Sequence, residues 1–176
     1  VYNGIDETTA PESAQTLSRL RKLKAAGNKI VLFLGRITLQ KGPDYFVRAA
    51  ARVLQRNPSV VFLVSGSGDM EAQMMDMAAR LGIAHKLFFT GFLQGAERDE
   101  AYRAADLFVM PSVSEPFGIA PLEAMKSGTP VLISKQSGVS EVVRHALKAD
   151  FWDVDEMANK ILSIVGLPGL QETLSE

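Results

Sequence analysis

The chain has 176 residues, 47% of them apolar, and a formal net charge of −1. This length and apolar content suit one globular domain with a buried core, and the near-zero charge gives no reason to expect nucleic acid as a partner. The absence of cysteine excludes disulfides and thiolate metal sites. The longest apolar runs have five residues, so we expect no transmembrane segment.

The first residues read Val1-Tyr-Asn-Gly-Ile-Asp6, without a methionine or a charged-then-apolar leader. We expect an excised part of a longer cytoplasmic protein, either free or held peripherally at the inner face of a membrane. Residues 1–28 are predicted to form a linker and a leading helix, residues 29–166 the main domain, and residues 167–176 a C-terminal tail.

Short apolar runs alternate with stretches of helical periodicity along the chain. A weak amphipathic pattern over residues 11–26 comes first, Pro43 suits the first position of the next helix, and Gly82 caps the one after it. The predicted strands are residues 29–34, 60–64, 87–89, 107–110 and 129–133. The helices predicted to follow them are residues 43–56, 70–81 and 96–105, one around Leu122 and Met125, and residues 139–146 and 154–165.

Five successive strand-then-helix units predict an α/β fold, with a Rossmann-like parallel sheet covered by helices on both faces. In such sheets, ligands bind outside the carboxyl ends of the strands. Small or polar residues follow every predicted strand, which points to a binding site at this edge. These strand exits are residues 35–36, 65–68, 90–92, 111–115 and 134–138.

The most informative exit carries Glu115 and Glu123, eight residues apart. Glu115 falls at a strand-to-helix turn and Glu123 about two turns into the helix, which separates them by ~12 Å along the axis. The free amides of a helix N-terminus lie between them and suit an anion. Because carboxylates accept hydrogen bonds from sugar hydroxyls, the spacing indicates a nucleotide-diphosphate sugar. The competing interpretation is a helix-start acid and a solvated side chain.

Two cations lie near the first strand exit. Arg36 follows the strand directly, and Lys41 lies in the loop before the next helix. A guanidinium and an ammonium group at a strand exit suit a diphosphate, although two surface cations would look the same in sequence.

Gly66 and Gly68 stand in Ser65-Gly-Ser-Gly-Asp69, which resembles half of a dinucleotide fingerprint. Position 71 is Glu instead of the third glycine, so an NAD-dependent dehydrogenase is disfavoured. The two glycines are interpreted as admitting a ligand to the backbone, with a plain turn as the alternative.

The exit after the third strand holds Gly91, Phe92 and Leu93. It offers backbone groups and an apolar wall to a nucleobase, or else forms a tight turn around a buried Phe92. His85 and His145 lie far from these loops in sequence, and no acidic or histidine cluster has metal-ligand spacing, so we expect no metal.

Together these motifs resemble those of retaining glycosyltransferases of the GT-B fold, the group 1 or glycogen synthase-like family. Glu115-Pro-Phe-Gly-x4-Glu123 is similar to the family's E-x7-E element, and Gly35-Arg36 with Lys41-Gly42 is similar to its G-R-x4-K-G element. Asn3-Gly-Ile-Asp6 resembles its interdomain linker. The resemblance covers about residues 1–165.

The resemblance implies one half of a GT-B enzyme, the C-terminal domain that binds the donor. It implies that Arg36 and Lys41 hold the diphosphate and stabilise it as it departs, in place of a metal, and that Glu123 holds the ribose hydroxyls. The backbone around Gly35 belongs to the same site. The sugar is assigned to Glu115 and the amides of Phe117, Gly118 and Ile119.

The implied donor is a UDP-, GDP- or ADP-sugar such as UDP-glucose, with no tightly bound cofactor. The implied partner is the N-terminal domain of the same enzyme, which would bring the acceptor, so the isolated domain is expected to be inactive. Residues 144–151 lack the family's glycine-rich turn, which leaves five or six strands open. A non-catalytic nucleotide-sugar-binding module and a nucleotide-sugar epimerase are the alternative functions.

Overall fold

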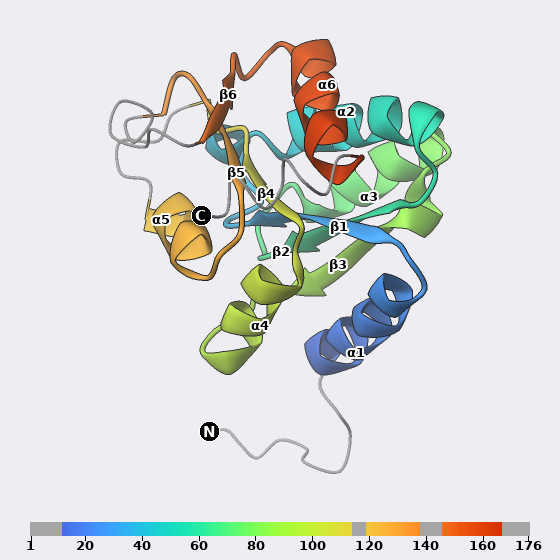
Figure 1. Cartoon of the computed structure of the whole chain (residues 1–176). Coiled ribbons are helices and arrows are strands. Elements are labelled where there is room, and N and C mark those ends of the chain that lie inside the picture. Colours follow the sequence, from blue (N-terminus) through green and yellow to red (C-terminus); the bar gives the residue numbers. More distant parts are fainter. Residues whose placement is uncertain (1–11, 114–118, 138–145, 167–176) are drawn as a thin grey trace.

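The computed structural model describes residues 12–113, 119–137 and 146–166, in which helices and strands alternate (Figure 1). The strands are β1 (Lys29–Leu34), β2 (Val60–Ser65), β3 (Leu87–Gly91), β4 (Leu107–Met110), β5 (Val131–Ser134) and β6 (Leu147–Ala149). The α-helices are α1 (Glu12–Ala25), α2 (Pro43–Arg56), α3 (Glu71–Arg80), α4 (Ala96–Ala104), α5 (Ile119–Lys126) and α6 (Val154–Val165). Two short 3-10 helices are η1 (Leu39–Lys41) and η2 (Ala84–Lys86).

All six strands are parallel and lie in the order β3-β2-β1-β4-β5-β6. This confirms the predicted Rossmann-like α/β fold, and β6 settles the open question of a sixth strand. The chain winds outward from β1 to one side and from β4 to the other. These two neighbours therefore form the point where the winding reverses, which is where ligands bind in such sheets.

The sheet separates two apolar layers, because successive side chains of a strand point to opposite faces. On β1, Ile30 and Leu32 belong to the layer under α1, α4 and α5, whereas Val31 and Phe33 belong to the layer under α2, α3 and α6 (Figure 1). Burial on both faces explains why the central strands are continuous apolar runs in the sequence.

The predicted elements match the observed ones apart from shifts at their ends. β3 continues to Gly91 because a register shift after Val64 pairs Ser65 with Gly91. β5 starts two residues later than predicted, because the amide of Thr129 donates to the carbonyl of Ala124 at 2.9 Å and Pro130 has no amide to pair with a neighbouring strand. The helix predicted over residues 139–146 falls mainly outside the described residues, as do the linker motif and the C-terminal tail.

α1 packs against β3 and α4 and fills part of the core. Its Leu17 and Leu20 are buried. Near its end, Lys24 pairs with Asp106 at 3.3 Å, and the other oxygen of that buried carboxylate accepts the Ile30 N–H at 2.8 Å. One acidic side chain thus ties α1 to the start of β1 and to the chain entering β4.

Within the described ranges, every helix is too short or too polar to span a bilayer.

Candidate functional site

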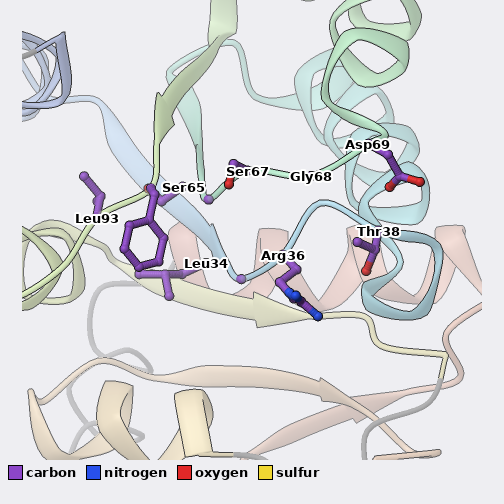
Figure 2. A pocket seen from close by; sticks show the side chains of 11 residues that line it. Leu34, Arg36, Thr38, Ser65, Ser67, Gly68, Asp69 and Leu93 are labelled. Atoms are coloured by element: carbon purple, nitrogen blue, oxygen red, sulfur yellow. The ribbon is translucent and has the colours of Figure 1, made fainter.

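A cavity of about 560 Å³ opens at the carboxyl ends of β1, β2 and β3 (Figure 2). It is lined by residues 34–36 and 38 around the end of β1, residues 65–69 around the end of β2, and residues 92–93 after β3. Its volume lies within the range of about 300–1,000 Å³ that is usual for small-molecule sites. The cavity therefore lies at the edge of the sheet where the sequence predicted a site.

The floor of the cavity is made by two loops in backbone contact. The amide of Gly35 donates to the carbonyl of Ser65 at 3.0 Å, and the amide of Ile37 donates to the carbonyl of Ser67 at 3.0 Å. These bonds continue the pairing of β1 with β2 beyond the strands. The two loops are thereby held together where they line the cavity.

Gly66 and Gly68 are required by this contact. A Cβ on Gly66, whose φ is +140°, would lie 1.8 Å from the carbonyl oxygen of Gly35. A Cβ on Gly68 would lie 2.4 Å from the carbonyl oxygen of Ile37. The sequence interpretation was that these glycines admit a ligand. The structure shows that they admit a neighbouring loop, although both still line the cavity.

The cavity has an apolar end and a polar end. Figure 2 shows Leu34 and Leu93 toward one side and Arg36, Thr38 and Asp69 toward the other. Phe92 also lines the cavity and is 68% exposed, so the alternative of a tight turn around a buried Phe92 is wrong. An exposed ring beside leucines suits a flat apolar group, and the exposed guanidinium of Arg36 suits an anion.

Lys41 lies where the segment after β1 touches the segment after β4. The amide of Val113 donates to the carbonyl of Gln40 at 2.8 Å, and a Cβ on Gly42 would lie 2.0 Å from the carbonyl oxygen of Pro111. Lys41 is half-buried between these two contacts. This places its ammonium-bearing segment at the winding reversal between β1 and β4.

Glu123 lies on α5 and is held by two side chains of α4. Its Oε1 accepts a hydrogen bond from the Tyr102 hydroxyl at 3.1 Å, and its Oε2 lies 3.9 Å from Nη2 of Arg98. Burial raises the pKa of Tyr102 above its ordinary value, and the charge of Glu123 raises it further, so the hydroxyl stays protonated and donates. The interpretation of Glu123 as a merely solvated side chain does not describe this carboxylate.

The structure brings together part of the predicted set. Gly35, Arg36, Gly66, Gly68, Phe92 and Leu93 line the cavity. Gly91 lies just beside it, where its carbonyl accepts the Gly66 amide at 2.8 Å. Lys41, Glu123 and the exposed Ile119 flank the exit of β4 and are not among the lining residues. Glu115, Phe117 and Gly118 lie outside the described residues.

Sequence reasoning missed several residues of this region. Thr38 and Asp69 line the cavity, and Arg98 and Tyr102 hold Glu123. Asp69 ends the glycine motif and carried a usable signal, whereas nothing in the polar helix α4 indicates a partner on α5. Across the described ranges, no three histidine or acidic side chains gather in a metal-binding arrangement.

The sheet order defines a Rossmann-like α/β domain with a cavity at the carboxyl ends of its strands. The sequence profile of the glycosyl transferases group 1 family matches residues 15–176. The chain belongs to this family, as its motifs indicated.

Two curated relatives illustrate the match. An uncharacterized glycosyltransferase of Methanocaldococcus jannaschii is 38% identical over 149 residues, covering 82% of this chain and 38% of the relative. The D-inositol 3-phosphate glycosyltransferase of Nocardia farcinica is 39% identical over 148 residues, covering 80% of this chain and 33% of the relative. The chain thus spans between 33% and 38% of the length of these relatives.

Solved structures agree with the fold. HepE of Anabaena in complex with UDP-glucose superimposes with a TM-score of 0.79 at 28% identity, covering 99% of this chain and 50% of that one. The C-terminal domain of a glycosyl transferase group 1 family protein from Francisella tularensis has the same fold, with a TM-score of 0.78 at 21% identity. That match covers 96% of this chain and 93% of that chain.

Proposed function

We propose that this chain is the donor-binding domain of a retaining glycosyltransferase, which moves a sugar from a nucleotide-diphosphate sugar to an acceptor hydroxyl. The observation that carries the proposal is the cavity at the carboxyl ends of β1 to β3, with a guanidinium at one end and an exposed aromatic ring beside leucines. Membership of the family supports the transfer reaction, and the complex of HepE with UDP-glucose supports the class of donor.

In this proposal the nucleobase lies in the apolar part of the cavity, against Phe92 and Leu93, and the diphosphate extends toward Arg36. Lys41 contacts the diphosphate from the β1–β4 side, and Glu123 accepts the ribose hydroxyls. The donor sugar is assigned to Glu115, Phe117, Gly118 and Ile119.

The two cations give the proposed reaction its electrostatic component. As the bond between the sugar and the diphosphate breaks, negative charge grows on the leaving oxygen, and fixed cations stabilise it more in the transition state than in the bound donor. The acceptor is expected to come from the N-terminal domain of the same enzyme. The chain alone should therefore bind donor weakly and transfer almost no sugar.

Titration calorimetry of the 176-residue chain with UDP-, GDP- and ADP-glucose tests the proposal. Loss of a hydrogen bond between charged groups costs about 1.5–3 kcal/mol, so Arg36→Ala should weaken binding by about 10- to 150-fold. Arg103→Ala is the matched control, because Arg103 is an exposed arginine in the last turn of α4, away from the cavity. The proposal fails if no donor binds at millimolar concentration, or if Arg36→Ala binds as tightly as Arg103→Ala.

A further inference from the structure

Two side chains of a neighbouring helix contact the carboxylate of Glu123, one by a hydrogen bond and the other by an ion pair. Tyr102 donates to Oε1 at 3.1 Å, and Nη2 of Arg98 stands 3.9 Å from Oε2. Tyr102 and Arg98 are four residues apart on α4 and so share one face of that helix. Both α4 and α5 begin at the carboxyl edge of the sheet, where the cavity opens.

Tyr102 is fixed by its surroundings. Its side chain is 1% exposed, and its ring packs edge-on against Phe108 of β4 with centroids 5.8 Å apart. Its backbone carbonyl accepts the buried Thr129 hydroxyl at 2.6 Å. Because the ring cannot shift without disturbing the core, the position of its hydroxyl determines where the Glu123 carboxylate stands.

The carboxylate keeps acceptor capacity for a ligand. Two oxygens offer about four lone-pair sites, of which Tyr102 occupies one and Arg98 faces another. The side chain of Glu123 is 37% exposed, so its remaining sites are open to solvent. Two adjacent hydroxyl groups, such as the 2′ and 3′ hydroxyls of a ribose, are donors with the spacing to occupy both oxygens at once.

We propose that Tyr102 and Arg98 are positioning residues that present Glu123 to the vicinal diol of the ribose, and that the site thereby selects ribonucleotides over 2′-deoxyribonucleotides. This inference rests on the proposed function, in which Glu123 binds the ribose. It adds that Tyr102 and Arg98 set the position of the Glu123 carboxylate, and that this position discriminates between ribonucleotides and 2′-deoxyribonucleotides.

The test compares matched pairs of nucleotides by titration calorimetry: UDP with 2′-deoxy-UDP, GDP with 2′-deoxy-GDP, and ADP with 2′-deoxy-ADP. For the pair that binds most tightly, the chain should prefer the ribonucleotide by about 10-fold or more, the worth of one hydrogen bond to a charged acceptor. Glu123→Ala should bring that ratio close to one. Tyr102→Phe and Arg98→Gln should each lower the ratio at least about threefold and leave the deoxynucleotide affinity unchanged.

Tyr45→Phe is the matched control, because Tyr45 lies on α2 across the sheet, where its ring contacts Phe151. It should leave the ratio unaltered. If Glu123→Ala keeps the full preference, or if no pair binds, the proposed role of Glu123 fails and the inference with it. If Glu123→Ala abolishes the preference but Tyr102→Phe and Arg98→Gln retain it, the proposed function stands and the positioning role is refuted. An equal loss of affinity for both nucleotides would assign Tyr102 a structural role only.

Discussion

The contact between the loops after β1 and β2 leads to a sharp prediction about Gly66. An alanine there would place its Cβ 1.8 Å from the Gly35 carbonyl oxygen while holding a φ of +140°. Two other glycines allow the steric contact and the backbone strain to be measured separately. A Cβ on Gly68 meets the Ile37 carbonyl at 2.4 Å without a positive φ, whereas Gly82 has a φ of +75° and open space around its Cβ position.

The sizes of the effects follow from these geometries. Backbone strain of this kind costs about 1–3 kcal/mol, and a close contact in a packed region costs about 1–3 kcal/mol. We therefore expect Gly66→Ala to lower the free energy of unfolding by about 2–6 kcal/mol, and Gly68→Ala by about 1–3 kcal/mol. Gly82→Ala, with strain alone in the left-handed region, should cost about 1–2 kcal/mol.

Urea unfolding followed by circular dichroism measures these differences, with an unchanged m-value showing that the unfolding reaction is the same. The melting temperature should fall by roughly 2–4 °C for each kcal/mol. Gly66→Ala should also weaken nucleotide binding because it separates the loops under the cavity, while Gly82→Ala should not. A Gly66→Ala chain as stable as the Gly82→Ala chain would refute the proposed steric contact.

Three further predictions concern the core. Leu20→Ala should lower the free energy of unfolding by about 2–5 kcal/mol, because Leu20 lies on the buried face of α1 and is fully buried; a loss below about 1 kcal/mol in urea unfolding would show that α1 is not part of the core. Asp106→Ala leaves the buried Ile30 N–H without its acceptor and should lower the free energy of unfolding by about 1–3 kcal/mol in the same assay; an unchanged free energy of unfolding would contradict the stabilising role of this hydrogen bond. Burial raises the pKa of Tyr102 above its unfolded value of 10.0. The protonated hydroxyl therefore contributes its full share to the free energy of unfolding below pH 10, and this contribution declines above pH 10, where the unfolded chain loses the proton first. The unfolding free energy should fall more steeply above pH 10 in the natural chain than in Tyr102→Phe, and equal slopes would contradict the raised pKa.

Short-range patterns made much of the fold predictable. Residues 30–34 and 60–64 are continuous apolar runs because β1 and β2 are buried on both faces, and the helical stripe starting at Pro43 repeats with the period of α2. β6 could not be predicted from an apolar run, because it has three residues, of which only Ala149 is buried. Its pairing with β5, where Leu147 lies opposite Leu132, decides that it is a strand.

The candidate site was likewise predictable from the sequence only in part. The sequence by itself located the edge of the sheet, because strand exits are marked by Gly35, Arg36 and Gly66 in the local pattern, and the family's motifs fall there. Only the tertiary structure decided which groups meet. The hydrogen bond from Tyr102 to Glu123 joins residues 21 positions apart on different helices, and no local periodicity encodes how α4 lies against α5. That arrangement depends on the packing of both helices onto the sheet, which is a property of the whole chain.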